Sequence, residues 1–435
     1  MDTQSLNEAF FNFLTASPTP FHAVSAMAER FRSHGFIPLR EQENWQLSPG
    51  NSYFVVREDG ALIAFSLGSE SPAAAGFRIL GAHSDSPSLQ IKPRPDARNQ
   101  QLHQLGVEIY GGALLSPWFD RPLSIAGRVS CRIGDTLQTL LLDFRQPLLI
   151  IPSLAIHLDR KANSNRSINA QLHMVPIISH MISETFPDFK AILKDQIARE
   201  YPEKNAAEIL GFDMFCYDWQ PPCLLGLNND FISAGRLDNL LSCFVGMQAM
   251  LEARGTGSRM FICNNHEETG SMSATGAQGS FPLATLERII PDVQSRQISL
   301  SRSFFISMDN AHGGHPNFTD KADPLHTILL NHGPVIKINA NQRYATSSFS
   351  KAVFQLLADE VQVKTQEFVM RNDMACGSTI GPLIASRLGV PTVDVGAPSL
   401  AMHSIRELTG SSDPSFLHRI ILHFLNREHL PGEKR

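Results

Sequence analysis

The sequence has few charged residues and few cysteines for its length. Lys, Arg, Asp and Glu make up 18% of its 435 residues, against about 25% in an average soluble chain. Because 43% of the residues are hydrophobic, this shortage argues against disorder and for a large buried fraction or extensive subunit contacts. The six cysteines include no C-x-x-C pair, which argues against a zinc finger or a disulfide scaffold. We expect free, mostly buried thiols in a reducing cytoplasm.

Long apolar runs and an excess of positive charge are also missing. No run of 18 apolar residues occurs, and the segment 140–156 is broken by Asp143, Arg145 and two prolines, so we expect no transmembrane helix. The net charge of −5 gives no excess of positive charge that would predict binding to nucleic acid or to an anionic membrane. The N-terminal MDTQSLNEAFFNFL carries acids where a signal peptide needs bases, so we expect a cytoplasmic protein.

Short apolar runs alternate with helical patterns in both outer parts of the chain. The runs 77–82, 260–263, 304–308 and 392–395 each end in a polar or glycine-rich turn and are typical of buried strands. Helical spacing of apolar residues predicts helices over 6–16, 21–32, 238–253, 349–359, 379–388 and 415–425. Such alternation predicts an α/β fold, a mixed sheet with helices on both faces.

The middle of the chain has a different pattern. Strand-like stretches occupy 106–110, 123–133 and 136–144, and one amphipathic segment lies near 206–210. Few long helical periods occur here, which predicts a mainly β domain inserted into the α/β domain. We therefore predict that the α/β domain comprises 1–92 and 235–435, with the inserted domain at 93–234.

Polar clusters follow the four predicted strands. The first is followed by His83 and Asp85, the second by Glu267 and Glu268, and the third by Asp309. The segment after the fourth leads to His403, and Asp238 opens a predicted helix. Because ligands bind beyond the carboxyl ends of strands in open α/β sheets, these side chains could converge on one crevice.

Convergence would bring four carboxylates together, those of Asp238, Glu267, Glu268 and Asp309. Without cations they would repel and raise each other's pKa values. Two divalent ions would neutralise them, and histidine with carboxylate ligands suits zinc, with Mn²⁺ or Co²⁺ as substitutes. Two metals about 3.5–4 Å apart would activate a water and polarise a carbonyl. In the adjacent Glu pair, one acid could bind metal while the other acts as general base.

Each cluster also has an ordinary structural reading. His83 and Asp85 could form a structural hydrogen-bonded pair, the Glu pair could be a solvated turn, and Asp238 could be a helix N-terminal acid. The string HEETG is not the H-E-x-x-H zincin motif, because position 270 is Gly. The metal hypothesis depends on the clusters occurring together.

Seven ordered strings then give the sequence a family resemblance. They are GAHSDSPSLQIKP (81–93), GRLDN (235–239), NHEETGS (265–271), MDNAHGGHPN (308–317), GPVIKINANQRYA (333–345), RNDMACGSTIGP (371–382) and LAMHSIRE (400–407). Together they resemble the aspartyl aminopeptidase family, whose members are cytosolic dinuclear zinc metallopeptidases. IPSLAIHLDR (151–160) extends the resemblance through the predicted insertion.

The resemblance implies a metal-ligand set, namely His83, Asp238, Glu268, Asp309 and His403. Asp238 would bridge two zinc ions. His83 and Asp309 would complete one site, and Glu268 and His403 the other.

Further site residues follow from the same resemblance. Glu267 would be the general base, and Asp85 would orient His83. His157 would reach the active site of a neighbouring subunit and stabilise the oxyanion, although from the residues alone it reads as a core histidine. Lys337 would receive the acidic side chain of the substrate, although a solvated strand lysine is the commoner case. His312 and Tyr344 would line the pocket.

The sequence also departs from the family pattern. Gly313 and Gly314 replace a small apolar pair, Thr269 replaces the usual Val, and Asn265 replaces an acid. None is a predicted ligand, but the two glycines lie beside the pocket and put fine substrate preference in doubt.

The sequence therefore predicts a metal-dependent aminopeptidase that prefers N-terminal Asp or Glu. By the resemblance it would form dimers through the inserted domain and a tetrahedral dodecamer, with no nucleic-acid or membrane partner. The alternative enzyme is a related dinuclear zinc hydrolase, either a broad or neutral aminopeptidase or a deacylase. From another class, a non-catalytic oligomeric shell is disfavoured because the ligand positions and the base are all present.

Overall fold

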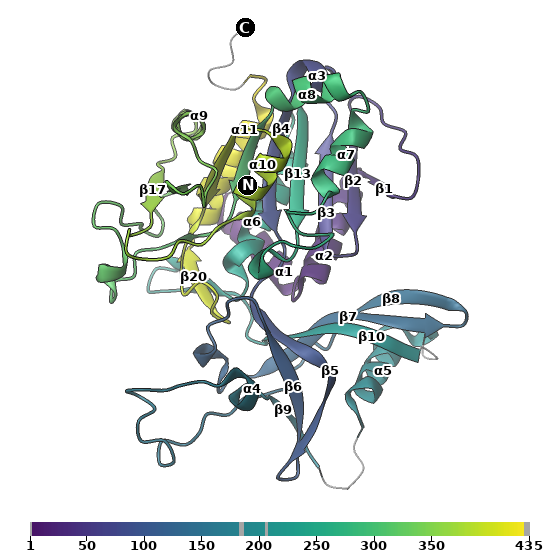
Figure 1. Ribbon diagram of the computed structural model, residues 1–435, viewed down its shortest axis with the longest axis vertical. Helices are drawn as coiled ribbons and strands as arrows, with labels where there is room; N and C mark the ends of the chain where they lie inside the picture. The colour runs from purple at the N-terminus through teal and green to yellow at the C-terminus, as the bar shows by residue number, and fades with distance from the viewer. Residues whose placement is uncertain (1, 182–186, 205–207, 430–435) are drawn as a thin grey trace. The chain divides into compact units, whose positions relative to one another are not determined.

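A computed structural model gives the structure of residues 2–181, 187–204 and 208–429. The chain divides into two compact units. The first comprises Met1–Asp85, Pro222–Met402 and Glu407–Arg435, and the second comprises Ser86–Pro221 and His403–Arg406. Figure 1 shows both units as ribbons. The predicted segment 206–210 falls partly outside the described residues.

The first unit is built on a nine-stranded mixed sheet (Figure 1). Its strands, in spatial order, are β1 (Ile37–Leu39), β2 (Ser52–Arg57), β3 (Ala61–Ser66), β13 (Ser258–Asn264), β4 (Phe77–His83), β14 (Phe304–Met308), β18 (Thr392–Gly396), β16 (Val335–Ile338) and β17 (Gln366–Val369). The central four, β13, β4, β14 and β18, run parallel to one another. Their carboxyl ends therefore lie at the same end of the sheet. This is the arrangement in which the polar clusters that follow these strands can meet.

Helices cover both faces of this sheet. One face packs against α1 (Thr3–Thr15), α2 (Pro20–Ser33), α6 (Leu237–Glu252), α9 (Ser348–Glu360) and α11 (Asp413–Asn426). The other packs against α7 (Phe281–Ile289), α8 (Val293–Ser301) and α10 (Ile380–Leu388). With both faces covered, β4, β13, β14 and β18 are buried at every position, which explains their continuous apolar runs.

A smaller five-stranded sheet completes the first unit. Its order is β11 (Cys223–Leu225), β12 (Phe231–Ala234), β20 (Glu407–Gly410), β19 (Pro398–Leu400) and β15 (Ala311–His312). Short helical segments also occur at α3 (Pro72–Ala75), η3 (Glu267–Thr269) and η4 (Thr319–Lys321). The turn η3 carries the two glutamates of the predicted site.

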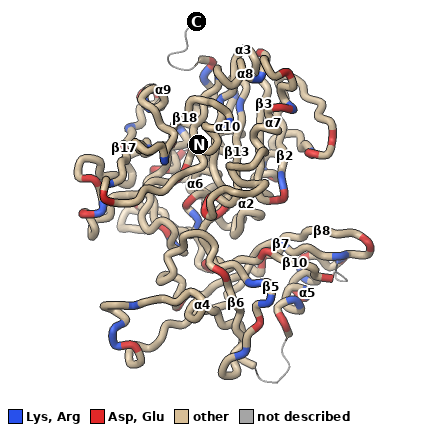
Figure 2. The backbone as a smooth tube through the Cα atoms, in the orientation of Figure 1, with Lys and Arg blue, Asp and Glu red and all other residues tan. Residues whose placement is uncertain are grey.

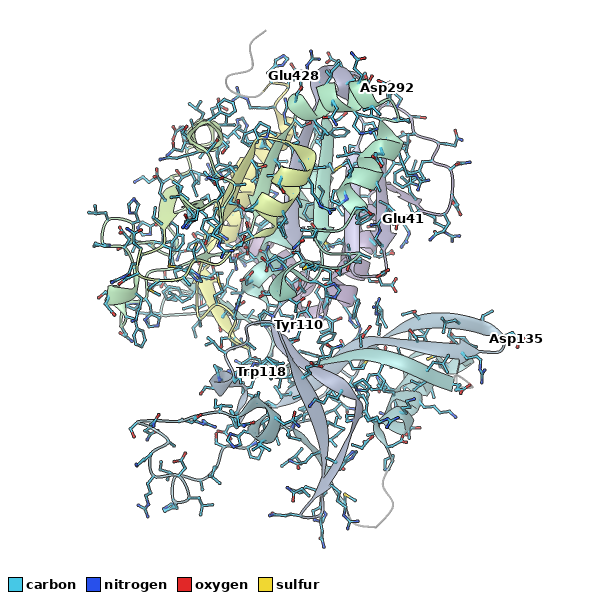
Figure 3. All side chains as sticks on the ribbon, viewed as in Figure 1. Glu41, Tyr110, Trp118, Asp135, Asp292 and Glu428 are labelled. Atoms are coloured by element: carbon cyan, nitrogen blue, oxygen red, sulfur yellow. The ribbon has the colours of Figure 1, made fainter. Side chains whose placement is uncertain are left out.

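The second unit contains a six-stranded sheet. Its order is β8 (Thr136–Asp143), β7 (Leu123–Ile133), β10 (Glu208–Asp218), β5 (Ser88–Asn99), β6 (Leu102–Tyr110) and β9 (Ile177–His180), and all of these pairs are antiparallel. The helices α4 (Ala170–His173) and α5 (Phe189–Glu200) and the turns η1 (Ser116–Trp118) and η2 (Pro202–Lys204) accompany it. Trp118, labelled in Figure 3, is buried in the core of this unit.

Two details of the middle segment differ from the sequence-based prediction. Residues 208–210 of the predicted amphipathic segment begin strand β10, in which Glu208 and Ile209 pair with β7. The helix α5 was not predicted, although Asp188 caps it by accepting a hydrogen bond from Ala191 N. An Asp ahead of apolar residues at four-residue spacing was the signal that could have found it.

The predicted α/β class is confirmed. The four predicted strands correspond to β4, β13, β14 and β18, and the six predicted helices to α1, α2, α6, α9, α10 and α11. Among the described residues, no helix combines the length and apolar character needed to cross a bilayer. Figure 2 shows Lys and Arg interspersed with Asp and Glu along the chain.

Candidate functional site

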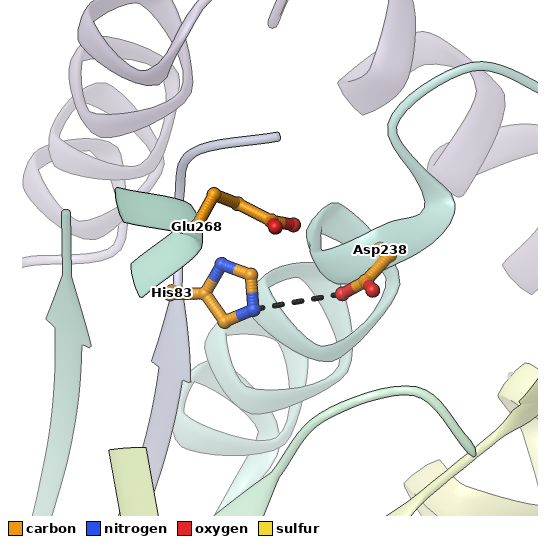
Figure 4. A group of neighbouring side chains, drawn as sticks. All are labelled: His83, Asp238 and Glu268. Carbon is orange, nitrogen blue, oxygen red and sulfur yellow. Dashed lines mark ion pairs between the residues drawn. The ribbon is translucent and has the colours of Figure 1, made fainter. Parts of the chain in front are cut away.

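The centre of the site is a buried histidine between two carboxylates. His83 is the last residue of β4 and is 1% exposed. Its Nε2 lies 3.5 Å from Asp238 Oδ1 and 3.5 Å from Asp309 Oδ1. One ligand atom each from His83, Asp238 and Glu268 lies within 4.8 Å of the others, and Figure 4 shows these three side chains converging.

Asp238 is positioned by an irregular start to α6. Arg236 has φ +62° and caps the helix, and Asp238 itself has non-helical backbone angles, with a cis peptide bond to Asn239. The Asp238 N–H donates to Glu407 Oε2 at 3.0 Å. Asn239 Nδ2 donates to Met308 O at 2.8 Å, which ties this turn to the end of β14.

The two glutamates lie on η3, and Asp85 holds this turn. The N–H of Glu267 donates to Asp85 Oδ1, and the N–H of Glu268 donates to Asp85 Oδ2, both at 3.1 Å. Asp85 Oδ1 also lies 3.4 Å from His83 Nδ1, and the Asp85 carbonyl lies 3.1 Å from the same nitrogen. One buried carboxylate therefore fixes both the histidine and the turn that carries the glutamates.

The electrostatics of the cluster call for a cation. Burial, together with Asp309, Asp85 and Asp238, raises the pKa of Glu267 to about 8. Burial and the charge of Asp238 hold the pKa of Glu268 well above its ordinary value. Without a cation, these acids would therefore take up protons.

His83 shows the opposite balance. Burial alone would lower the pKa of His83, but Asp238, Asp309 and Asp85 outweigh burial and hold that pKa well above its ordinary value. A divalent ion would replace the proton held between these carboxylates.

The donor set fits zinc. It offers imidazole nitrogen and carboxylate oxygen from His83 and Asp238, which are buried, and from Glu268, which is half-buried, and this is the ligand chemistry of catalytic zinc sites. A thiol also lies close, since Cys243 Sγ is 3.0 Å from His83 O and 3.5 Å from Cys263 Sγ. Burial and the Cys263 thiol hold the pKa of Cys243 well above its ordinary value, so this thiol stays protonated and donates to His83 O.

Lys337 lies beside the cluster rather than in solvent. It is 4% exposed on β16, and its Nζ is 3.2 Å from Asp309 Oδ2. The Tyr344 ring lies 5.5 Å from the same ammonium, and the rings of Tyr344 and His312 each stand edge-on to Phe368. The structure thus brings the three predicted pocket residues together around Phe368, with His312 exposed.

Two predicted site residues lie in the second unit. His157 is on an exposed turn. His403 has φ +67°, and its Nδ1 lies 3.2 Å from Gly112 O, within the same unit. Their predicted roles at the metal site therefore stay predictions.

Sequence reasoning missed several residues that support the site. Glu407 is 2% exposed and accepts from Asp238 N, and Asn239 anchors the same turn. Both lie inside quoted strings, LAMHSIRE and GRLDN, so a polar residue in the same string as a predicted ligand was the available signal. Asp394, buried on β18, gave no signal apart from its unusual place in an apolar strand.

A family model and a curated relative both match almost the whole chain. The family model described as "Aminopeptidase I zinc metalloprotease (M18)" matches residues 13–424. The "Probable M18 family aminopeptidase 2" of Stutzerimonas stutzeri (strain A1501) is 49% identical over 426 residues, covering 98% of this chain and 99% of that protein.

Solved structures share the fold over almost the whole chain. The "Cryo-EM structure of the Ape4 and Nbr1 complex" contains a chain with 38% identity and a TM-score of 0.93, covering 98% of this chain and 86% of that one. The "Structure of S. cerevesiae mApe1 dodecamer" gives 27% identity and a TM-score of 0.84, covering 98% and 97%.

Proposed function

The chain belongs to the aminopeptidase I zinc metalloprotease (M18) family, and from this we propose that it removes acidic N-terminal residues from peptides with two zinc ions and Glu267 as general base. Zinc aminopeptidase activity follows from the family, and the family resemblance of the sequence is confirmed. The number of ions, the base and the preference for Asp or Glu are the proposed part.

The observation that carries the proposal is the cluster of the buried His83 and Asp238 with the half-buried Glu268, beside Glu267. Asp309, 3.5 Å from His83, and His403 complete the proposed ligand set. When bound, zinc would supply Lewis acidity that activates water and polarises the scissile carbonyl.

Glu267 is suited to proton transfer. Its pKa of about 8 is that of the buried acid without the metal charge, and a nearby cation would lower it toward the working pH. In the proposed reaction the Glu267 carboxylate accepts a proton from the attacking water and delivers it to the leaving amine. Asp85 keeps Glu267 and Glu268 in fixed relative positions through their amides.

The proposed acidic specificity depends on Lys337. A substrate carboxylate that enters a buried pocket needs a paired cation, and Lys337 is a buried cation with an aromatic neighbour. Because Lys337 also contacts Asp309, the same ammonium would link the substrate side chain to the ligand cluster. His312 and Tyr344 would form the rest of this pocket.

We extend the assembly of the solved relatives to this chain. One similar structure is titled a dodecamer, and we propose that this chain forms dimers through residues 93–234 and then a tetrahedral dodecamer in the cytoplasm. In that assembly His157 would enter a neighbouring subunit's site and donate a hydrogen bond to the developing oxyanion.

A substrate panel combined with metal analysis tests the proposal. The purified protein should contain two zinc ions per chain and hydrolyse Asp- and Glu-nitroanilides with a higher kcat/KM than Leu- or Lys-nitroanilides. Equal or faster turnover of the Leu substrate would contradict the acidic preference and favour a broad aminopeptidase. Turnover of N-acyl substrates alone would favour a deacylase.

A further inference from the structure

A row of side chains crosses the sheet next to the proposed pocket. In the parallel register, Ser307 of β14 pairs with Asp394 of β18, and Lys337 of β16 pairs with Phe368 of β17. The antiparallel register of β16 and β18 pairs residue 336 with residue 395, which brings Lys337 beside Asp394. Because paired residues point to the same face, Ser307, Asp394, Lys337 and Phe368 form one row.

Asp394 anchors two other segments to this row. The side chain is fully buried, and Thr379 Oγ1, at the start of α10, donates to Asp394 Oδ1 at 2.7 Å. The N–H of Ala345 donates to Asp394 Oδ2 at 2.6 Å. The Asp394 N–H in turn donates to Thr346 Oγ1 at 2.9 Å. The segment 344–346 is therefore hydrogen-bonded both to the side chain and to the backbone N–H of Asp394.

The surroundings of Asp394 are shaped for a carboxylate. A Cβ on Gly381 would lie 2.3 Å from Asp394 Oδ1 and 2.4 Å from Oδ2, so α10 can approach only because this position is glycine. Burial raises the pKa of Asp394 above its ordinary value, while the Ser307 hydroxyl, hydrogen bonds from Ala345 and Thr379, and the charge of Lys337 oppose the rise. A buried acid at such a position needs these partners.

The anchored segment carries Tyr344, one wall of the pocket. The Tyr344 ring lies 5.5 Å from Lys337 Nζ, and its centroid lies 6.4 Å from that of Phe368. The Tyr344 side chain also contacts the thiol of Cys376. Loss of the bonds at Asp394 would therefore release the residue that lies next to both Lys337 and Cys376.

We propose that Asp394 is a positioning residue for substrate specificity: through Ala345, Thr379 and the neighbouring Lys337, it holds Tyr344 and the Lys337 ammonium in the arrangement that receives the substrate side chain. This inference rests on the proposed function, in which Lys337 binds the acidic residue. Asp394 itself need not touch substrate or metal.

Thiol labelling tests the positioning without using activity. Cys376 and Cys223 are partly exposed, whereas Cys131, Cys216, Cys243 and Cys263 are buried. In a Cys223→Ser background, the aromatic disulfide reagent DTNB should label Cys376 at least about fivefold faster in Asp394→Asn than in the parent, because Tyr344 no longer packs against the thiol.

Kinetics test the link to specificity. Asp394→Asn should raise KM for Asp-nitroanilide severalfold, with little change in KM for Leu-nitroanilide and unchanged zinc content. Asp413→Asn is the matched control, since it removes another buried carboxylate that accepts two backbone N–H bonds in the same unit. It should change neither the labelling rate nor the KM ratio.

Thiol labelling and kinetics together distinguish a failure of the proposed function from a failure of the inference about Asp394. If the parent shows no acidic preference, the proposed function fails, while faster labelling of Cys376 still supports the positioning by Asp394. Unchanged labelling and an unchanged KM ratio in Asp394→Asn would overturn the inference. Should Asp394→Asn not fold, Thr379→Val removes a single bond to Asp394 and should give the same two effects at smaller size; no effect there would also overturn it.

Discussion

Asp85 holds two parts of the site at once. Its carboxylate accepts the N–H groups of Glu267 and Glu268, one on each oxygen, and approaches His83 Nδ1. The family resemblance implied only that Asp85 orients His83. The bonds to η3 join residues 182 and 183 positions apart, and no local pattern reports such a contact.

Replacement of Asp85 therefore has a specific expected result. Asp85→Asn presents an N–H₂ group to one of the two backbone N–H groups, so the turn with Glu267 and Glu268 should shift. We expect a fall in kcat of about 100-fold or more and a fall in zinc affinity of about 10–100-fold. Steady-state kinetics and competition with a chelator measure the two effects. Asp135→Asn, at an exposed turn, is the control, and equal zinc affinity in both variants would contradict this role.

Lys337 lies in a different environment from the one that its residue type predicts. A lysine on a strand reads as solvated, and only the family resemblance gave it a role. The structure buries Lys337 against Asp309, a contact that the sequence could not supply because Lys337 lies on β16 and Asp309 follows β14.

Removal of the Lys337 charge should act on substrate binding first. Lys337→Met keeps the stem and loses the ammonium, so KM for an Asp substrate should rise about 10-fold or more, which matches the loss of a buried charged hydrogen bond of about 1.5–3 kcal/mol. KM for a Leu substrate should change much less. Lys351→Met, which loses a partly exposed pair with Glu367, is the matched control. A similar rise in KM for both substrates would argue against Lys337 as the acid receptor.

At the scale of elements, the sheet was the most predictable part. The apolar runs that became β4, β13, β14 and β18 are short and bounded by turns, and their burial on both faces leaves a clear pattern. The start of β10 was harder, since Ile209 is buried and its neighbours are not, and a β-bulge at 209–211 interrupts the alternation. Strand pairing, which is a long-range interaction, decided the outcome there.

The fit of α10 against β18 gives a test at this scale. Gly381→Ala would place a methyl group within 2.4 Å of both Asp394 carboxylate oxygens, so the helix or the carboxylate must move. We expect the free energy of unfolding to fall by about 1–3 kcal/mol, measured by urea denaturation. Gly257→Ala, where nothing lies within 4 Å of a Cβ, is the control. Equal stability of the two variants would mean that α10 packs less closely than described.

At the scale of the whole molecule, the composition predicted how much of the chain is buried, but not which charged residues are. The low charge fraction predicted extensive burial, and buried runs do fill both faces of the central sheet. The composition could not identify individual buried acids, such as Asp394 and Asp413, because each depends on hydrogen-bond partners far away in sequence.

Asp413 makes global stability depend on pH. Burial raises its pKa from 3.8 to about 7, so between these values the folded state keeps a proton that the unfolded state has lost. The contribution of this group is therefore full below about pH 4 and is lost as the pH rises through 7, by up to ~4 kcal/mol.

Asp413→Asn should remove this pH dependence. The melting temperature of the variant minus that of the parent should become more positive from pH 4 to pH 8, measured by calorimetry on protein in the same metal-loaded state. Asp135→Asn should give a constant difference over this range. A constant difference for Asp413→Asn as well would show that Asp413 ionises in the folded protein as readily as in the unfolded chain.

The central claim is that the buried cluster holds zinc while Glu267 transfers the proton, and the most direct test measures both in one variant. Zinc per chain and turnover of an Asp-nitroanilide should be determined for the parent and for Glu267→Gln. The account predicts two zinc ions per chain in both proteins and a loss of kcat of at least about 100-fold in Glu267→Gln. Near-parental turnover in a fully zinc-loaded Glu267→Gln would contradict it.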